Sequence, residues 1–489
     1  MMLVWVVGTA AVAVLLGASI CFVQLHIDPS EKGVLTKAIA SLAMFIAFCA
    51  MFLLPIDIFT IKQPMTESQG DIRIFYYGIY LLLAIFAFFL LPFAYFLYEE
   101  DDGSNQIAPQ AWRAGKYSFG ILGVALTLTL VILCANFEKL ASQTGSERVQ
   151  SAIATLMGLM LAVGLIGYTT YTAYGLAELP LVLFQRNKPS WTGIEYIGHT
   201  GELLQINAEI ETLQARNMSR PESFWPPSDR LEIAKLRDRQ SQLALVCDQA
   251  TPRQRSLRVS WIGRILNRAA GCFLGCLSFL IICSLLISMV DKVMNSECGF
   301  RCGFESNQLL ANPISLILLF SSDNFPLDLI FFSLLMFYLF AATLTGLSHL
   351  GVRFLFIKLY SMKIRRTKHN ALLMGVWLMI FFLLAINSQT LVLAPHYATF
   401  GNQQTADFEG NIRSCQLEDV GHGCTTSVLW QINNSLFANI PLIGGLTFLS
   451  NIVFMVIYLC TMVWVSCTKQ RTYLREIDDA DDLVENLLS

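Results

Sequence analysis

Two aspartates lie at the ends of apolar segments, each two residues after a proline, in Pro55-Ile-Asp57 and Pro326-Leu-Asp328. A carboxylate in an apolar span is costly unless it faces a cavity, a partner or a bound proton. Asp328 follows Pro326 at a helix start, where free backbone amides favour an acid. Asp57 lies at a helix end, against the dipole, so a cap cannot explain it. Both aspartates are therefore candidates for a pathway or a proton-linked step, and Asp57 needs a partner, a wet cavity or a proton.

A tyrosine-rich run is the second group that could do chemistry. Tyr168, Tyr171 and Tyr174 recur every third residue, which puts them on one helix face, and Glu178 follows one turn later. Their hydroxyls make this helix unusually polar for lipid. A polar seam between helices and a substrate pathway are both open, so the three tyrosines and Glu178 are candidate pathway or proton-linked residues. Glu178, close to Pro180, is expected at the cytosolic exit.

The elements that carry these residues are those of a membrane protein. Of 489 residues, 55% are hydrophobic and 14% are charged, whereas soluble domains carry about 25% charged residues. A helix needs about 20 apolar residues to cross a bilayer. Nine stretches meet this length, at residues 2–23, 35–60, 74–98, 118–135, 152–181, 270–290, 325–347, 371–394 and 441–465. Residues 313–321 are apolar over too short a length and are predicted to be re-entrant or interfacial.

The positive charges orient these helices. Lys32 and Lys37 follow the first stretch, which is therefore predicted to be a retained span with a lumenal N-terminus. Most of the 33 Lys and Arg then fall on the cytosolic side. The predicted fold is all-α and polytopic, with nine transmembrane helices, a lumenal N-terminus and a cytosolic C-terminus. Residues 1–181 hold helices 1–5, residues 182–269 form a cytosolic helical hairpin, residues 270–466 hold helices 6–9 with lumenal loops 291–324 and 395–440, and residues 467–489 form an acidic cytosolic tail.

The cytosolic hairpin is predicted from two short amphipathic patterns. Leu203, Ile206, Ile210 and Leu213 share one helix face, and a proline-rich turn at 220–229 separates them from a second helix. Two interpretations are open, a spacer folded on itself and a docking surface for a cytosolic partner. Phe224 and Trp225 at the tip are the docking candidates, because aromatic side chains at an exposed turn are unusual unless something covers them.

The lumenal loops carry four of the 13 cysteines, Cys298, Cys302, Cys415 and Cys424. An even number in an oxidising space predicts disulfides. Cys415 with Cys424 closes a short loop and is the first choice, while Cys298 with Cys302 would close a very tight one, so cross-pairing between the loops stays open. Asn433 begins a glycosylation sequon on the same side.

Several classes of function lack their residues. Gly115-Lys116 is followed by Tyr117 where a phosphate-binding loop needs Ser or Thr. The six histidines have no pair at helical metal-ligand spacing, and no nucleophile lies beside a base. A net charge of −3 without a basic and aromatic stripe indicates no nucleic-acid partner. We therefore expect no enzyme, no metal site and no bound nucleic acid.

The chain resembles a known family along nearly its whole length. The matching words include Leu54-Pro-Ile-Asp-Ile-Phe59, Pro92-Phe-Ala-Tyr-Phe-Leu-Tyr-Glu-Glu-Asp101, Thr170-Tyr-Thr-Ala-Tyr-Gly175, Phe325-Pro-Leu-Asp328 and Leu393-Ala-Pro-His-Tyr397. These words resemble the limb-region membrane protein family. The tyrosine-rich motif at 170–175, the motif at 92–101 that ends in acidic residues, and Cys415 with Cys424 point to its branch of lysosomal cobalamin transporters.

The resemblance implies a nine-span, homodimeric glycoprotein of the lysosomal membrane, with the plasma membrane as a second location. Cobalamin (vitamin B12) would be its transported ligand, with no covalently bound cofactor. The implied partners are an ABC transporter of subfamily D, cytosolic cobalamin-processing proteins and membrane lipid. The leading hypothesis is a cobalamin exporter or an obligatory export partner. The alternatives are an endocytic or signalling receptor of the family's lipocalin-interacting type, and a membrane chaperone of an ABC transporter.

Overall fold

The fold is described from a computed structural model. It describes residues 2–28, 33–61, 67–99, 107–136, 141, 144–185, 205–213, 215, 226, 233, 235–237, 240, 261–295, 310–322, 324, 326–354, 357–360, 362, 367–406, 412–421 and 423–488. The chain divides into two compact units. The first comprises Met1–Leu179 with Gly275–Val465, and the second comprises Pro180–Leu274 with Ser466–Ser489.

Long apolar helices build the first unit. In its N-terminal part they are α1 (Met2–His26), α2 (Val34–Ile61), α3 (Glu67–Ile85) continued through η1 (Phe86–Leu90) into α4 (Leu91–Glu99), α5 (Ile107–Ala135), and α7 (Gly145–Gly167) continued through η2 (Tyr168–Thr172) into α8 (Ala173–Gln185). In its C-terminal part they are α11 (Trp261–Asn295), α12 (Pro313–Ser321), α13 (Leu327–Leu350), α14 (His369–Leu393), α15 (Pro395–Phe400), α16 (Val428–Asn439) and α17 (Pro441–Leu488). The far ends of α8, α11 and α17 belong to the second unit.

Eight helices among the described residues are long and apolar enough to cross a membrane. They are Val34–Ile61, Ile72–Glu99, Ala108–Ala135, Glu147–Phe184, Ile265–Asn295, Leu327–Leu350, His369–Leu393 and Pro441–Val465. Each overlaps one of the nine predicted spans, so an all-helical polytopic membrane protein is confirmed. The first predicted span falls on α1, of which the stretch Val12–His26 is apolar but shorter. The ninth span and the orientation of the chain remain predictions.

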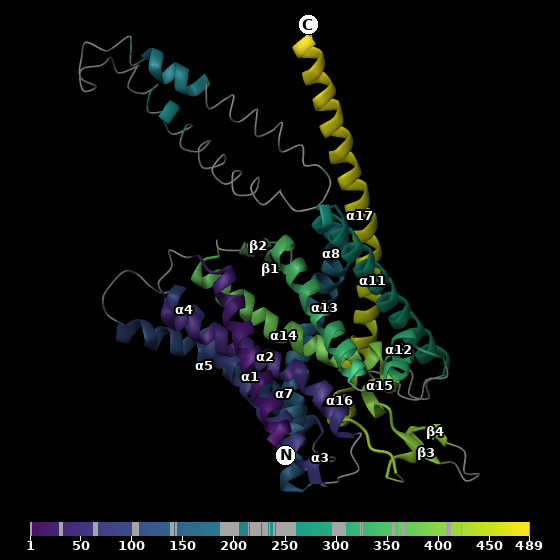
Figure 1. Ribbon diagram of the computed structural model, residues 1–489. Helices are drawn as coiled ribbons and strands as arrows, with labels where there is room; N and C mark the ends of the chain where they lie inside the picture. The colour runs from purple at the N-terminus through teal and green to yellow at the C-terminus, as the bar shows by residue number, and fades with distance from the viewer. Residues whose placement is uncertain are drawn as a thin grey trace. The chain divides into compact units, whose positions relative to one another are not determined.

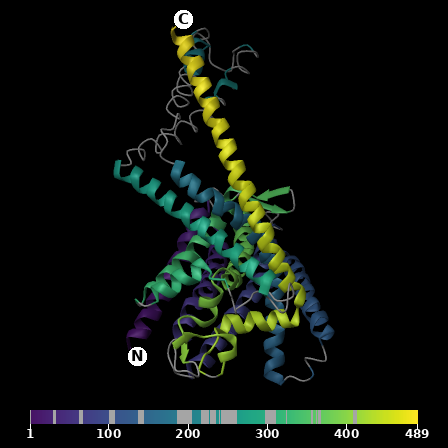
Figure 2. The same cartoon turned by 90° about the vertical axis from the view of Figure 1, so that its right-hand side faces the viewer.

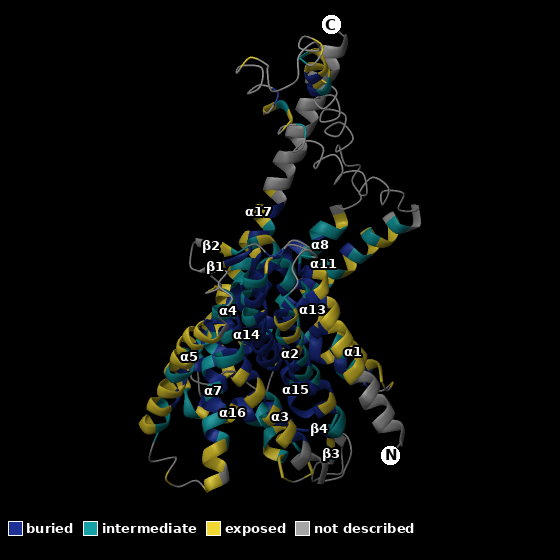
Figure 3. Ribbon diagram, turned by 90° about the vertical axis from the view of Figure 1, so that its left-hand side faces the viewer, coloured by how far each residue is buried: buried dark blue, intermediate teal, exposed yellow. Residues whose placement is uncertain are grey.

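Helix α14 forms the centre of the first unit. In its apolar window 83% of the residues are buried, more than in any other candidate span of the described residues. It packs against α7 and α2, and it is the dark core in Figure 3, where α5 shows a mostly exposed surface. Glycines let the helices approach closely, because a Cβ on Gly164 would overlap the carbonyl oxygen of Phe381 and one on Gly167 would overlap the Phe382 ring. Small residues at these contacts thus position α14.

Two π-helical turns interrupt long helices, η1 between α3 and α4 and η2 between α7 and α8. A wider turn displaces one carbonyl from the regular pattern, which then needs another donor. At η1 the indole Nε1 of Trp377 in α14 donates to the carbonyl of Ala87, at 2.6 Å. At η2 the hydroxyls of Thr172 and Thr343 pair at 2.8 Å. The turn η1 therefore gains a donor to its carbonyl from α14, whereas η2 is tied to α13 by a hydrogen bond between side chains.

The two ends of the first unit differ. At one end, which we name the hairpin end, β3 (Gln404–Ala406) and β4 (Ile412–Ser414) form an antiparallel pair beside α15 (Figure 1). Helix α16 lies there across the ends of the longer helices, as the yellow-green helix of Figure 2 shows. At the opposite end β1 (Val352–Phe354) pairs with β2 (Ile357–Tyr360) where α14 begins. The connection from α14 to α17 therefore folds over one end of the bundle.

The second unit contains the predicted cytosolic hairpin. Ile206, Ile210 and Ile233 form a small buried cluster with Leu236 packed against it. The amide of Gln240 donates to Asn207, at 2.7 Å. The predicted apolar face of the first helix therefore packs against Ile233 and Leu236 beyond the proline-rich turn, as expected for a hairpin folded on itself. Phe224 and Trp225, the docking candidates, lie outside the described residues.

Candidate functional site

The carboxylate of Asp57 is bound by the start of a helix. Asp57 lies in the last part of α2, is 1% exposed, and accepts hydrogen bonds through Oδ2 from the backbone amides of Val428, at 2.8 Å, and Leu429, at 3.3 Å. These are the first two residues of α16. The first amides of a helix have no partner within it, and the helix dipole there favours a negative charge. The partner that Asp57 needs is therefore the N-terminus of α16.

The start of α16 is also held by α15. Ser427 caps the helix by accepting from the amide of Trp430, at 3.2 Å. Its own hydroxyl donates to the carbonyl of Ala398 and its amide to the carbonyl of Thr399, both at 2.8 Å. The N-terminus of α16 is thus fixed by α15 on one side and by α2 on the other.

Asp328 holds the other short helix of this connection. It lies in the first turn of α13, where the sequence predicts an acid, and is fully buried. Its Oδ2 accepts from the hydroxyl of Tyr397 in α15, at 2.8 Å. Burial, and then the Asp328 carboxylate, raise the pKa of Tyr397, so that its hydroxyl stays protonated and donates. The two Pro-x-Asp acids therefore each anchor one short helix of the segment between α14 and α17.

Tyrosine and amide side chains extend inward from Asp57. The hydroxyl of Tyr76 lies beside the carboxylate of Asp57. The rings of Tyr76 and Tyr80 are 5.6 Å apart, one turn along α3. Asn387 of α14 then donates through Nδ2 to the Tyr80 hydroxyl, at 3.3 Å, and to the carbonyl of Ala50, at 3.2 Å. A buried polar chain therefore runs from the hairpin end into the bundle.

Sequence reasoning missed this inner part of the site. Asn387, Ser388, Gln389 and Thr390 are consecutive in α14 and each is at most 6% exposed. Ser388 donates to Asn433 of α16 at 2.8 Å, and Gln389 donates to Ser450 of α17 at 3.5 Å. Four consecutive polar residues in an apolar span are unusual. This run of polar residues was the sequence signal that could have identified the inner part of the site.

A small cavity adjoins these polar side chains. It is lined by Tyr80, Met157, Leu161, Leu384, Ser388, Leu429, Ile432, Asn433 and Leu436. Its volume of about 10 Å³ is the space of one water molecule. This cavity therefore has room for a bridging water and none for a bulky solute.

The three predicted tyrosines do not converge on Asp57. Tyr168 stacks on Phe454, with ring centroids 4.6 Å apart. Tyr171 stacks on Phe382 at 5.3 Å, and its hydroxyl donates to the carbonyl of Gly351 at 3.2 Å. The π-helical turn at Tyr168–Thr172 breaks the regular spacing on which the prediction of a common face rests. These contacts favour the polar seam, and Asp57 lies beside the tyrosines of α3 instead.

Glu178 pairs with a histidine at the opposite end of the first unit. Its Oε1 lies 3.1 Å from Nδ1 of His349, in the last turn of α13. The Glu178 side chain is 6% exposed and that of His349 is 46% exposed. Tyr174, the third predicted tyrosine, lies beside the same carboxylate. Glu178 and Tyr174 are therefore brought together, as their spacing predicts.

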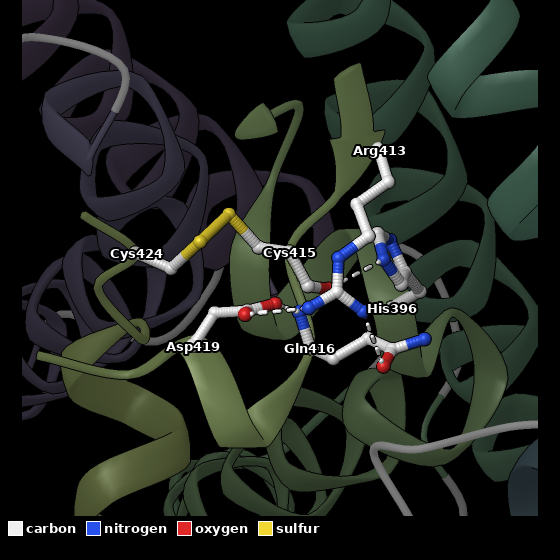
Figure 4. Close-up of polar contacts among 6 residues, drawn as sticks. All are labelled: His396, Arg413, Cys415, Gln416, Asp419 and Cys424. Atoms are coloured by element: carbon white, nitrogen blue, oxygen red, sulfur yellow. Dashed lines mark hydrogen bonds and ion pairs between the residues drawn. A yellow bond between two sulfur atoms is a disulfide. The ribbon is translucent and has the colours of Figure 1, made fainter. Parts of the chain in front are cut away.

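The predicted disulfide between Cys415 and Cys424 is present and buried. Figure 4 shows the polar groups around it. Arg413 of β4 donates to Asp419 at 2.8 Å, and Nε2 of His396 lies 3.2 Å from the carbonyl oxygen of Cys415. Burial lowers the pKa of His396 and the Cys415 carbonyl opposes this. A neutral ring therefore suits this position. Cys298 and Cys302 lie outside the described residues.

The glycosylation prediction at Asn433 does not fit the structure. Asn433 is 4% exposed within α16, its Nδ2 donates to the carbonyl of Leu429 at 3.0 Å, and its side chain lines the cavity. The amide nitrogen that would carry the glycan is thus buried and occupied. Its burial in the folded bundle leaves no room for a sugar.

Comparisons with known proteins place the chain among membrane proteins. Residues 4–224 match the model of the LMBR1-like membrane protein family. A protein of Aspergillus clavatus named probable lysosomal cobalamin transporter is 28% identical over 99% of this chain and 97% of its own length. Proteins of the same name from Sclerotinia sclerotiorum and Nematostella vectensis are 27% and 26% identical, each over 99% of this chain. No solved structure matches.

Proposed function

We propose that this chain, whose residues 4–224 match the model of the LMBR1-like membrane protein family, moves cobalamin out of the lysosome or is an obligatory partner in that export. The observation that carries the proposal is the similarity over nearly the full length to proteins named probable lysosomal cobalamin transporter. The similarity extends over all eight candidate spans rather than a single segment.

The interior of the bundle supports a transport role. Polar side chains in a membrane span are costly and are kept where they serve a pathway or a moving part. Asn387 and its polar neighbours lie in the most buried helix, in line with the chain from Asp57 through Tyr76 and Tyr80. The segment between α14 and α17 is tied to the bundle by both Pro-x-Asp acids. An anchored cap of this kind suits a gate better than a free receptor domain.

The remaining parts of the proposal concern location and partners. We place the protein in the lysosomal membrane as a homodimer, working with an ABC transporter of subfamily D that supplies the energy of transport. Cytosolic cobalamin-processing proteins would receive the released cobalamin. The first sign of such an assembly would be recovery of the full-length chain with the ABC transporter from detergent extracts of lysosomes.

The test is release of cobalamin from lysosomes. Cells from which the gene has been deleted take up labelled cobalamin, and the label is measured in lysosomal and cytosolic fractions. The proposal expects retention in lysosomes and loss from the cytosol, with recovery when this chain is re-expressed. A receptor would instead change uptake at the cell surface. Unchanged lysosomal release in the deleted cells would overturn the proposal.

A variant of the buried polar run makes the test specific to the interior. Asn387→Leu keeps a similar volume but removes the amide that contacts Tyr80 and Ala50. We expect this variant to restore less release than the wild-type chain at equal lysosomal abundance. Thr127→Val on the exposed side of α5 is the matched control, since Thr127 bonds only within its own helix. Full recovery by Asn387→Leu would remove the polar run from the transport step.

A further inference from the structure

The pair of Glu178 and His349 has a geometry that the transport proposal does not use. The carboxylate is almost fully buried, whereas nearly half of the imidazole surface is exposed. A carboxylate acceptor 3.1 Å from Nδ1 requires the hydrogen of the ring on that nitrogen. In the neutral ring, the lone pair is then on Nε2. The pair therefore fixes both the orientation and the tautomer of an accessible imidazole.

The two helices that carry this pair are packed rigidly together. A Cβ on Gly175 would overlap the carbonyl oxygen of Ala342, and one on Gly346 would overlap that of Tyr171. Tyr171 also spans the helix end, donating to the carbonyl of Gly351 and accepting from the amide of Arg353 at 3.1 Å. Close backbone contact of this kind leaves little freedom for sliding. His349 is thus held in place by α8 and α13 together.

A histidine that ligates a metal usually donates its other ring N–H to a carboxylate, a backbone carbonyl or water, and the Glu178–His349 pair offers this arrangement. The carboxylate fixes the tautomer and the orientation of the ring. A bare metal ion would need several protein ligands. Among the described residues, no group of three or more His, Cys, Asp and Glu could hold one. The metal that suits a single histidine is one that brings its own ligands.

A corrinoid is such a metal complex, because the nitrogens of the corrin ring occupy the equatorial positions of its cobalt. We propose that Nε2 of His349 is an axial ligand for the cobalt of cobalamin, with Glu178 as the positioning residue. This inference rests on the proposed function and adds to it a contact at a defined end of the bundle. The predicted orientation of the chain places that end at the cytosol.

The step is a ligand exchange without redox change. In aquocobalamin a water molecule occupies the upper axial position of Co(III). The lone pair of Nε2 replaces that water, which leaves as a neutral molecule, so that the cobalt–nitrogen bond forms as the cobalt–oxygen bond breaks. The Nδ1–H stays on the ring and its bond to Glu178 strengthens as the ring donates charge to the metal. Cyanocobalamin, whose cyanide does not leave, cannot make this exchange.

The test is the visible absorption spectrum of cobalamin with the purified full-length protein in detergent. Aquocobalamin is titrated with protein, and the spectrum is compared with that of aquocobalamin in free imidazole. The wild-type chain is expected to give the imidazole-ligated spectrum and His349→Ala to leave the aquo spectrum. Glu178→Gln should keep the ligated spectrum with about 10- to 100-fold weaker affinity. His396→Gln, at the hairpin end, is the matched control and should behave as the wild type.

Two further measurements, the binding of cyanocobalamin and the release of cobalamin from lysosomes, distinguish a misfolded variant from a failure of the inference or of the proposed function. Equal binding of cyanocobalamin by the wild-type chain and His349→Ala would show that the variant is folded. An unchanged aquocobalamin spectrum with the wild-type chain, or a ligated spectrum that persists in His349→Ala, overturns the inference. The proposed function is judged separately, because release from lysosomes is measured in cells and does not depend on which ligand the cobalt takes.

Discussion

Replacing Asp57 tests whether the N-terminus of α16 is held by a charge. Asp57→Asn keeps an oxygen that can accept from Val428 and Leu429 but removes the negative charge. Asp57→Ala removes the acceptor altogether and leaves both amides without it. The two variants therefore separate the hydrogen bonds from the charge.

The magnitudes follow from the contacts. A carboxylate at a partly buried helix N-terminus contributes up to about 2 kcal/mol, and a hydrogen bond to a charged group about 1.5–3 kcal/mol. Because asparagine retains the weaker neutral bonds, we expect Asp57→Asn to reduce the local stability of the start of α16 by roughly 1–3 kcal/mol. Each buried amide without a partner costs about 1–3 kcal/mol, so Asp57→Ala should cost roughly 2–6 kcal/mol.

Hydrogen exchange followed by mass spectrometry measures this loss at the place where it occurs. Since about 1.4 kcal/mol corresponds to a factor of ten, the peptide that contains Val428 and Leu429 should exchange roughly 5- to 150-fold faster in Asp57→Asn. Asp328→Asn is the matched control. It should loosen the contact with Tyr397 in α15 and leave the start of α16 less affected than Asp57→Asn does.

The reasoning fails if that peptide exchanges at the wild-type rate in both Asp57 variants. Faster exchange in Asp57→Ala alone would mean that the hydrogen bonds matter and the charge does not. In that case lysosomal release should survive in Asp57→Asn. Retained release with a loosened α16 would show that the anchor is structural and lies outside the transport step.

Three further predictions concern the same unit. Burial lowers the pKa of His396 below its ordinary value of about 6.5, so on acidification the unfolded chain binds a proton at this histidine before the folded chain does. The stability contributed by the neutral ring is therefore complete above a pH of about 6.5 and is lost as the pH falls from about 6.5 towards the lowered pKa. His396→Gln should therefore flatten the loss of protection of β4 on acidification, measured by hydrogen exchange corrected for intrinsic rates, and an unchanged pH profile contradicts this. Cys415→Ser removes the disulfide that closes a loop with a sequence separation of 9. We expect it to lower the free energy of unfolding of the hairpin end, measured with denaturant, by about 2–3 kcal/mol. Equal denaturation midpoints of the wild-type protein with and without reductant would contradict the disulfide. Gly175→Ala should destabilise the purified protein by about 1–3 kcal/mol or more, because the added Cβ would overlap the backbone of Ala342. Gly123→Ala is the control, since the space around its Cβ is open, and it should leave the melting temperature unchanged. Equal melting temperatures for the two variants would contradict the close helix contact.

The sequence alone was sufficient for eight of the nine predicted spans because their signal is local. A run of about 20 apolar residues has few uses other than crossing a bilayer. The same holds for Cys415 and Cys424, since a short separation within one loop already favours pairing. The position of Asp328 was also predictable, because an acid that follows Pro326 lies where acids are favoured at a helix start.

Asn433 and the tyrosine run show where local patterns mislead. A sequon is defined by three residues, but the burial of Asn433 depends on how α16 packs against α14 and α7. Likewise, Tyr168 and Tyr171 share a face only if the helix is regular, and they lie in a π-helical turn that packs against α13. Neither the burial of Asn433 nor the π-helical turn can be predicted from the neighbouring residues.

Asp57 separates the two levels most clearly. The sequence by itself determined that an acid at the end of an apolar helix must be compensated, because an unpaired charge there is too costly. Its partners are the amides of Val428, 371 residues away along the chain, and of Leu429. Every residue except proline has a backbone amide, so nothing in the residue types at 428 and 429 could identify them. Only the tertiary structure, by bringing the start of α16 to the end of α2, decided what Asp57 binds.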